Sequence, residues 1–280
     1  MRVVIITAHH KNDAVISIFK KYFSPIQVGA SISDVDLGIG KDNEGENISS
    51  KNKTFCELTA HYNLWKKDGY DYAGLMHYRR IFSPNKSIFN DIRKYAIYSV
   101  RYLLNLISMQ NLTLTYDTSL FVEAKSKLDN DSKSFLSYIE SEDIKNIDVL
   151  VPRKIRFAFV NIREQYSLSH CKHQFDLFNK IIIEKYPSMK SSIDIVNGQK
   201  KLYAYNMFVM RRELYHEYNE ILFDVLFALE QKIKLDGMDS YQQRIFGFLS
   251  ERFLNYFLEW KKGTLRIKEL QVLFIVDELK

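Results

Sequence analysis

The stretch YAGLMHYRR, residues 72–80, decides the fold that this sequence predicts. Its first seven residues form a largely apolar run of strand length, and Gly69 ends the segment before it. Upstream, residues 3–8 form another apolar run, residues 14–22 have helical spacing of apolar side chains, and residues 26–32 again suit a strand. Strands that alternate with helices in this way predict an α/β fold with a mostly parallel central sheet and flanking helices.

A polar loop that contains glycine, residues 34–46, connects the second predicted strand to a helix that runs to about Lys67. Asn47 or Ser49 can cap that helix. In open α/β sheets, ligands bind beyond the carboxyl ends of the strands. The sequence therefore places a candidate site near residues 9–11, 30–36 and 77–80.

The alternation of strands and helices stops after residue 82. Residues 83–146 are polar and helical, with an exposed loop expected at 125–133. We interpret them as a helical insertion, because their apolar content is too small for a core of their own. Further elements are predicted as strands at residues 147–151 and 202–210, and as helices at residues 163–185, 214–233 and 239–263.

The composition is that of a folded globular protein, with 280 residues of which 46% are hydrophobic and 26% charged. These values exclude a disordered chain, and the 10 glycines and 4 prolines exclude a collagen-like one. The net charge of +6 suits phosphate-bearing partners. It is spread along the chain without a Lys/Arg run or zinc-finger spacing, so no nucleic acid partner is expected. Cys56 and Cys171 are too few for a disulfide framework and favour a reducing, cytoplasmic setting.

No apolar run is long enough to cross a bilayer, and the start of the chain lacks the pattern of a secretory signal. The nearest apolar segment is residues 95–112, which follows Arg93 and Lys94. An ordinary packed helix is expected there, and contact with an anionic membrane surface is the alternative.

Two adjacent guanidinium groups end the 72–80 stretch. Arg79 and Arg80 suit a pyrophosphate, because each can donate a bidentate pair of hydrogen bonds to phosphate oxygens. His77 and Tyr78 precede them at the same strand end. The alternative is a solvated strand end at which one of the arginines pairs with a carboxylate.

The segment DNEGENISSKNKTFCELT, residues 42–59, is a second candidate site. Free N–H groups at a helix N-terminus attract anions, and Asn47, Ser49 and Asn52 can bind hydroxyls or phosphate. The alternative is that Asn47 or Ser49 only caps the helix and that Glu57 is a surface charge.

Two carboxylates near the last predicted helix are candidates for a general base. Glu251 lies close to the apolar face of that helix, and Asp239 begins it. Glu251 is expected to have a partner, such as Arg252 or Arg244, or else a raised pKa that suits proton transfer. A helix salt bridge is the alternative interpretation.

The sequence does not favour a metal site. Three residue pairs have ligand-like spacing, namely His170/His173, Asp34/Asp36 and Asp129/Asp131. No third ligand follows the histidine pair at a recognised spacing. Asp-x-Asp pairs can hold Mg²⁺ or Mn²⁺ against a nucleotide diphosphate, but ordinary loop carboxylates explain both of these pairs.

Five short segments occur in one order along the chain: PIQVGA (25–30), a run that starts with DNEGENISSKN and ends with CELTAHYNLWK (42–66), GLMHYRRIF (74–82), NMFVM (206–210) and YQQRIFGFLSERFLN (241–255). Together they resemble a bacterial glycosyltransferase family found in capsule and lipopolysaccharide gene clusters, long filed as a domain of unknown function. The resemblance runs from Ile5 to about Trp260, and residues 83–147 contain no motif that matches it.

This resemblance implies a GT-A-like, Rossmann-like fold in a single domain of residues 1–280. The implied parts are a nucleotide-binding half (1–82), the helical insertion (83–146), an acceptor half (147–262) and a tail (263–280). The implied reaction transfers a sugar from a nucleotide-diphosphate donor, expected to be UDP-linked, to a lipid-linked oligosaccharide in capsular or O-antigen synthesis. Some members of the family are galactofuranosyl- or galactosyltransferases, which makes these sugars the candidates. The implied location is the cytoplasm, with peripheral contact at the inner membrane.

In the GT-A fold an Asp-x-Asp motif normally follows the strand that is predicted here at residues 72–78, and this sequence has HYRR there instead. No metal cofactor is therefore expected, with Mg²⁺ or Mn²⁺ as the alternative. Arg79 and Arg80, helped by His10 and Lys11, are expected to neutralise the diphosphate leaving group.

The resemblance also implies roles for the other candidate residues. Glu251, with Asp239 second, is expected to deprotonate the acceptor hydroxyl. The remaining residues are expected on the donor side (Gln27, Gly29, Asn47, Ser49, Asn52, Glu57, Thr59, His77 and Tyr78) and on the acceptor or sugar side (Asn206, Tyr241 and Arg244).

Other functions on the same architecture are alternatives. A catalytically inactive scaffold and a basic protein that binds a membrane surface both fit the composition. A sugar-phosphate nucleotidyltransferase would need a glycine-rich phosphate loop after the first strand, which residues 9–11 do not provide.

Overall fold

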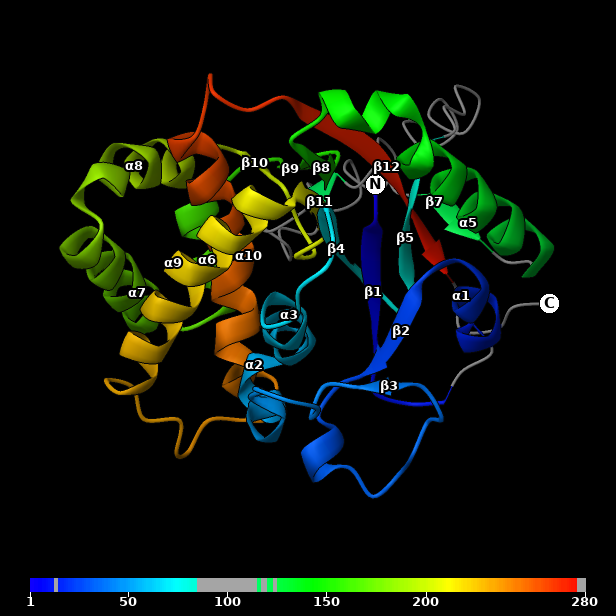
Figure 1. Cartoon of the computed structure of the whole chain (residues 1–280). Coiled ribbons are helices and arrows are strands. Elements are labelled where there is room, and N and C mark those ends of the chain that lie inside the picture. Colours follow the sequence, from blue (N-terminus) through cyan, green and yellow to red (C-terminus); the bar gives the residue numbers. More distant parts are fainter. Residues whose placement is uncertain (13–14, 85–114, 117–119, 123–124, 276–280) are drawn as a thin grey trace, which may run out of the picture.

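The computed structural model describes residues 1–12, 15–84, 115–116, 120–122 and 125–275 (Figure 1). A central sheet has helices on both sides, as the sequence predicts. The helices α1 (Ile16–Tyr22) and α5 (Lys125–Glu140) lie on one side, and α3 (Leu58–Trp65), α9 (Arg212–Glu230) and α10 (Ile245–Trp260) lie on the other (Figure 1). The predicted helix at residues 95–112 and most of the expected insertion lie outside the described residues.

Four neighbouring strands of the sheet run parallel. β1 (Val3–His9) lies between β4 (Tyr72–His77) and β2 (Ser24–Gln27), and β2 pairs with the short strand β3 (Gly40–Lys41). The strand expected at residues 26–32 ends early, because Gly29 adopts a left-handed φ of 67° and a 3₁₀ turn follows at Ala30–Ile32.

The rest of the sheet is mixed, so the expected mostly parallel sheet is not confirmed. β11 (Phe208–Arg211) runs antiparallel to β4 and to β8 (Val149–Pro152), and β5 (Arg80–Ser83) returns antiparallel from β4. β12 (Ile267–Ile275) lies between β8 and β5, parallel to the first and antiparallel to the second. The expected tail of residues 263–280 thus contains a strand inside the sheet.

The two faces of the sheet belong to separate apolar clusters. Ala73 and Leu75 of β4 pack in the cluster that includes α3, α9 and α10, whereas Tyr72 and Met76 pack in the cluster that includes α1 and α5. Alternate side chains of a strand point to opposite faces, so a strand covered on both faces is apolar throughout. This burial explains the continuous apolar pattern at residues 72–76.

The described chain also contains a small second sheet, four further helices and four further 3₁₀ turns. A second, antiparallel sheet joins β10 (Lys201–Leu202), β9 (Ile155–Phe157) and β6 (Thr115–Tyr116), while β7 (Leu120–Val122) pairs with β12. The other helices are α2 (Asn52–Phe55), α6 (Ile162–Ser169), α7 (Lys172–Lys185) and α8 (Lys190–Gly198), and 3₁₀ turns occur at Ser49–Lys51, Glu142–Asn146, Pro187–Met189 and Gln242–Arg244.

Three predicted elements differ from the observed ones for local reasons. Residues 125–133 are not a loop but the first half of α5, whose Leu128 is fully buried. The helix predicted at 163–185 is two helices, since the backbone is extended at His170, between α6 and α7. The strand predicted at 202–210 is β10 and β11, separated by a turn.

Two predicted helices also begin or continue differently. The helix expected from about residue 47 to 67 is interrupted at Cys56, which has a left-handed φ of 53° between α2 and α3. The last helix begins at Ile245 rather than at Asp239, because a 3₁₀ turn precedes it. Within the described residues, no helix combines the length and the apolar character that a bilayer crossing requires.

Candidate active site

A cavity of about 970 Å³ lies at the carboxyl ends of β1 and β4. Ala8 and His10 line it from the end of β1, and His77, Tyr78 and Arg80 line it from the turn between β4 and β5. Because β11 is antiparallel to β4, the residues that enter β11 lie beside the residues that leave β4. Three distant parts of the chain therefore meet at one point, as the rule for α/β sheets predicts.

The helical side of the cavity comes from α2, α10 and the segments next to them. Its residues are Asn52, Lys53, Cys56, Glu57, Ser240, Gln243, Arg244, Gly247, Phe248 and Glu251. The residues named on sequence grounds that line the cavity are His10, Asn52, Glu57, His77, Tyr78, Arg80, Asn206, Arg244 and Glu251. Those that do not line it are Lys11, Gln27, Gly29, Asn47, Ser49, Thr59, Arg79, Asp239 and Tyr241.

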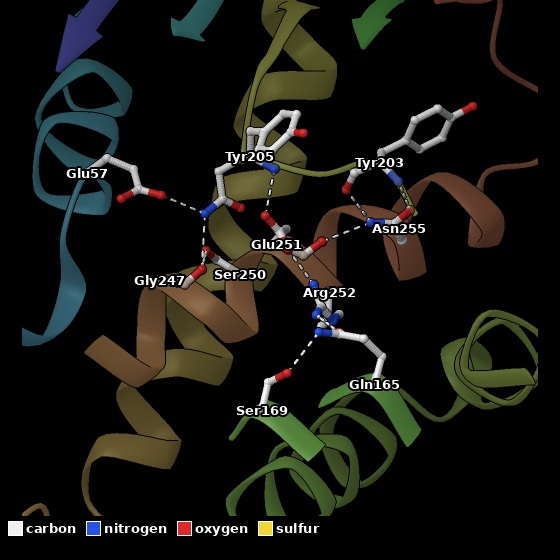
Figure 2. Close-up of polar contacts among 11 residues, drawn as sticks. Glu57, Gln165, Ser169, Tyr203, Tyr205, Gly247, Ser250, Glu251, Arg252 and Asn255 are labelled. Atoms are coloured by element: carbon white, nitrogen blue, oxygen red, sulfur yellow. Dashed lines mark hydrogen bonds and ion pairs between the residues drawn. The ribbon is translucent and has the colours of Figure 1, made fainter. Parts of the chain in front are cut away.

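One face of α10 holds the segment that enters β11 (Figure 2). Gly247, Glu251 and Asn255 are spaced four residues apart and therefore lie on the same face of the helix. Asn255 and Tyr203 exchange two hydrogen bonds, at 2.8 and 2.9 Å, and the N–H of Tyr205 donates to Glu251 Oε2 at 2.6 Å. These bonds fix the backbone that forms the cavity wall.

Two residues of this segment have unusual backbone conformations. Tyr205 and Asn206 have φ values of 75° and 50°, in the left-handed region that non-glycine residues rarely adopt. Such conformations cost of order 1–3 kcal/mol each and persist where surrounding bonds determine them. Asn206 is 4% exposed, and its amide donates to Gly247 O at 3.1 Å and to Glu57 Oε1 at 2.8 Å.

The two carboxylates of the cavity have different surroundings. Both oxygens of Glu251 are bonded: Tyr205 donates to one, and the buried guanidinium of Arg252 pairs with the other (Figure 2). Glu57 accepts a bond from Asn206 through Oε1, and no residue of the described chain bonds to its Oε2. Glu251 has the expected partner Arg252, and its catalytic role stays a prediction.

The two adjacent arginines are separated by the turn. The guanidinium of Arg80 lies beside the contacting rings of Tyr205 and Phe274, 4.6 Å from each centroid, in the cavity wall. Arg79 lies outside the wall, and its Nε faces the carbonyl of Ile275 at 3.5 Å. The expected pair of guanidiniums at one site is therefore reduced to Arg80.

Side-chain contacts of His10 and Tyr78 connect the ends of β1 and β4. The Tyr78 ring contacts the exposed His10 edge-on at 4.9 Å, and the Nζ of Lys11 lies 5.9 Å from its centroid. His77 donates from Nε2 to the carbonyl of Tyr205. Burial lowers the pKa of His77, while Glu57 opposes this shift and Arg80 adds to it. His9 lies beneath them, and burial lowers its pKa to about 4, so it is neutral at pH 7.

Asp42 organises most of the predicted donor residues that lie outside the cavity wall. It is fully buried and accepts four hydrogen bonds, from the N–H groups of Gly29 and Ala30 and from the hydroxyls of Ser49 and Thr59. Gly29, Ser49 and Thr59 thus hold the loop in place. A Cβ atom at Gly29 would lie 2.8 Å from Oδ1 of Asn52, so glycine is needed there on steric grounds too.

Other predicted site residues also bond to loops. Gln27 bridges to Val35 O and Leu37 N, and Asn47 bonds within its own turn. Asp239 accepts a bond from the N–H of Gln242 and caps the 3₁₀ turn before α10. Tyr241 is half exposed and packs on Phe248, next to the cavity.

Cys56 lies in the cavity wall and accepts a bond from Arg244 Nε at 3.2 Å. Burial, with a smaller effect from Glu57, raises the pKa of its thiol to about 11.

Because the thiolate is the reactive form, alkylation of Cys56 is expected to be slow at pH 8. In a Cys171→Ser variant, the rate with iodoacetamide should rise roughly tenfold per pH unit up to about pH 11. A rate that levels off near pH 9, as for a cysteine in a short peptide, would contradict this expectation.

In the described part of the chain, no three His, Cys, Asp or Glu side chains are grouped to hold a metal ion. His170 stacks on Phe248 at 4.1 Å, and Asp36 and Asp129 pair with lysines. The expectation that protein cations replace a metal stays a prediction.

Comparison with known protein families assigns the chain to one of them. Residues 4–262 match the family model described as domain of unknown function DUF4422. The chain belongs to the DUF4422 family. No curated protein matches it.

A solved structure resembles this DUF4422 chain over nearly its whole length. It is the apo structure of the bifunctional glycosyltransferase WbbM, with a TM-score of 0.77 and 27% sequence identity. The match covers 98% of this chain and 45% of the WbbM chain, so the DUF4422 chain spans less than half of that protein.

Sequence reasoning missed several residues of the cavity. Lys53, Tyr205, Gln243 and Phe248 all line it. Lys53 had a usable signal, since it lies in the first turn of a helix that follows a polar loop, where anions bind. Tyr205 directly precedes the NMFVM motif of the DUF4422 chain, but its position depends on a left-handed turn that the residue type does not indicate.

Proposed function

We propose that this chain is a glycosyltransferase of GT-A-like fold, which moves a sugar from a nucleotide-diphosphate donor to a hydroxyl of a glycan acceptor. The observation that carries the proposal is the likeness to WbbM, a bifunctional glycosyltransferase, over 98% of the chain at 27% identity. The cavity supports it, because it lies where α/β folds bind nucleotides.

The charges around the cavity support an anionic ligand. Lys53, Arg80 and Arg244 line it with positive charge. Of the two acidic residues in the wall, Glu251 is paired with Arg252 and Glu57 has no ion pair with a described residue. Fixed cations at a leaving group stabilise the charge that develops in the transition state, which is often the largest catalytic contribution.

In the proposed reaction, an acceptor oxygen forms a bond to the anomeric carbon as the bond from that carbon to the diphosphate oxygen breaks. The nucleoside diphosphate leaves with the electron pair, and Arg80 stabilises its new charge. The proton of the acceptor hydroxyl must pass to a base. The rings of Tyr205 and Phe274 contact the Arg80 guanidinium and help to hold it in the cavity wall.

The finer features rest on the family resemblance. We propose UDP as the nucleotide, galactofuranose or galactose as the sugar, and a lipid-linked oligosaccharide of capsular or O-antigen synthesis as the acceptor. A cytoplasmic location with peripheral contact at the inner membrane agrees with this acceptor. The net charge of +6 suits an anionic membrane surface.

A thermal-shift panel with UDP, GDP, CMP and dTDP tests the donor. UDP is expected to raise the melting temperature, because a ligand that binds only the folded state stabilises it by about 2.7 kcal/mol at a concentration of 100 Kd. Transfer from UDP-galactofuranose or UDP-galactose should then persist in EDTA. Absence of any nucleotide effect, together with absence of transfer, would reject the glycosyltransferase and leave a scaffold on the same fold.

A further inference from the structure

We infer that Glu57 is the general base of this site and that the buried amide of Asn206 orients it. This inference rests on the proposed glycosyl transfer and assigns the proton acceptor that the reaction requires. It also replaces the expectation that Glu251 has this role.

The carboxylates of Glu57 and Glu251 differ in how available they are to a substrate. A base needs a lone pair that points to the substrate and a charge that is not already neutralised. Glu251 lacks both conditions, since Arg252 and the N–H of Tyr205 occupy its two oxygens. Glu57 lines the same cavity with Oε2 unbonded to any described residue.

The amide of Asn206 orients the Glu57 carboxylate. Both neighbours of the Asn206 amide nitrogen, Glu57 Oε1 and Gly247 O, are acceptors, so the NH₂ group must face them. Asn206 is held in a left-handed conformation, and its own Oδ1 is buried with no partner among the described residues. The Asn206 amide thus bonds to α10 through Gly247 O and to Glu57 through Oε1. Because Oε1 is occupied, Oε2 is the Glu57 oxygen that remains for the substrate.

His77 is another titratable side chain of the cavity that could accept a proton. Glu57 and Arg80 both act on His77, one raising and the other lowering its pKa. The imidazole, the proposed base and the proposed phosphate-binding cation all line the same cavity. Protonation of His77 would add a positive charge beside Arg80, and burial opposes it as well, so His77 is not a favourable proton acceptor.

The step then balances as a single displacement. The acceptor oxygen attacks the anomeric carbon, its proton passes to Glu57 Oε2, and the nucleoside diphosphate departs from the opposite side. A single displacement inverts the anomeric configuration, so an α-linked donor gives a β-linked product and a β-linked donor gives an α-linked product.

Glu57→Gln tests the assignment, because glutamine keeps the bond from Asn206 and loses the basic oxygen. We expect kcat to fall about 10²–10⁴-fold, with the melting temperature and its increase on UDP addition unchanged. Glu44→Gln, at an exposed loop residue, is the matched control and should transfer like wild type. Glu251→Gln should lower the melting temperature and retain more transfer than Glu57→Gln.

Four outcomes overturn the inference in distinguishable ways. If wild-type protein neither binds UDP nor transfers sugar, the proposed function fails and the base assignment fails with it. If wild type transfers and Glu57→Gln transfers equally well, only the base assignment fails. Greater loss in Glu251→Gln than in Glu57→Gln, or a product with retained anomeric configuration by NMR, also rejects it.

Asn206→Asp provides a second readout that does not depend on Glu57→Gln. A new carboxylate beside Glu57 disfavours its charged form, so the acid limb of the kcat/KM profile should move to higher pH. The other groups that act on Glu57 are Cys56 beside it, His77 of β4, Arg244 before α10 and Tyr218 of α9. An unshifted acid limb would contradict the role of Glu57 as base.

Discussion

Replacing Arg80 by alanine is expected to reduce sugar transfer about 10²–10³-fold and to weaken the binding of UDP. Arg80 is the guanidinium that lines the cavity beyond β4, and it contacts the rings of Tyr205 and Phe274. Alanine removes the charge that would stabilise the departing diphosphate. Steady-state kinetics of transfer and calorimetric titration with UDP measure the two effects.

Two variants make the Arg80 prediction specific. Arg80→Lys keeps the charge but loses the planar fork and the stacked contacts, so an intermediate loss is expected. Arg79→Ala removes the neighbouring cation, which lies outside the cavity wall, and should keep most of the transfer activity. Equal losses from Arg79→Ala and Arg80→Ala would show that the two arginines act as a pair, contrary to their placement here.

Replacing Asp42 by alanine is expected to lower the free energy of unfolding by about 4 kcal/mol. The carboxylate is fully buried and accepts bonds from two backbone N–H groups and two hydroxyls. Alanine leaves the N–H groups of Gly29 and Ala30 without this acceptor, and the Thr59 hydroxyl can then donate only to Cys56 O. Because proteins are stable by only about 5–15 kcal/mol, denaturant titration should detect a large shift in midpoint.

The control for Asp42 is a carboxylate of the same loop region with little burial. Asp36 is exposed and pairs with Lys41, so Asp36→Ala should leave the unfolding midpoint nearly unchanged. The Asp42→Ala variant should also lose UDP binding, since Gly29 and the 3₁₀ turn at Ser49–Lys51 lose their common anchor. An unaltered midpoint in Asp42→Ala would contradict the structural role given to this residue.

The parts of the fold that the sequence predicted are those determined by local burial. β1 and β4 are covered on both faces and are apolar runs in the sequence for that reason. The antiparallel direction of β11 relative to β4 depends on the path of the chain between them. That path has no signature in the residues of either strand. The sequence predicts a loop at the first half of α5, because few of its residues, among them Leu128, face the core.

The sequence predicts those site residues that lie at the carboxyl ends of strands, where α/β sheets bind ligands. His10, His77 and Arg80 follow strands and do line the cavity. Arg79 was assigned with Arg80 because the two are adjacent, yet neighbours at a hairpin point in different directions. The bond between Asn206 and Glu57 joins residues 149 positions apart, and no spacing in a single sequence can indicate it.

The place of β12 in the sheet has a consequence for biosynthesis. β12 lies between β8 and β5 in the sheet. Because β12 begins at Ile267, the ribosome synthesises it well after both of its neighbours. Until then β8 and β5 each expose an unpaired edge, and such edges invite pairing with other chains. Truncation before β12 would leave both edges unpaired, and it is therefore expected to produce insoluble protein.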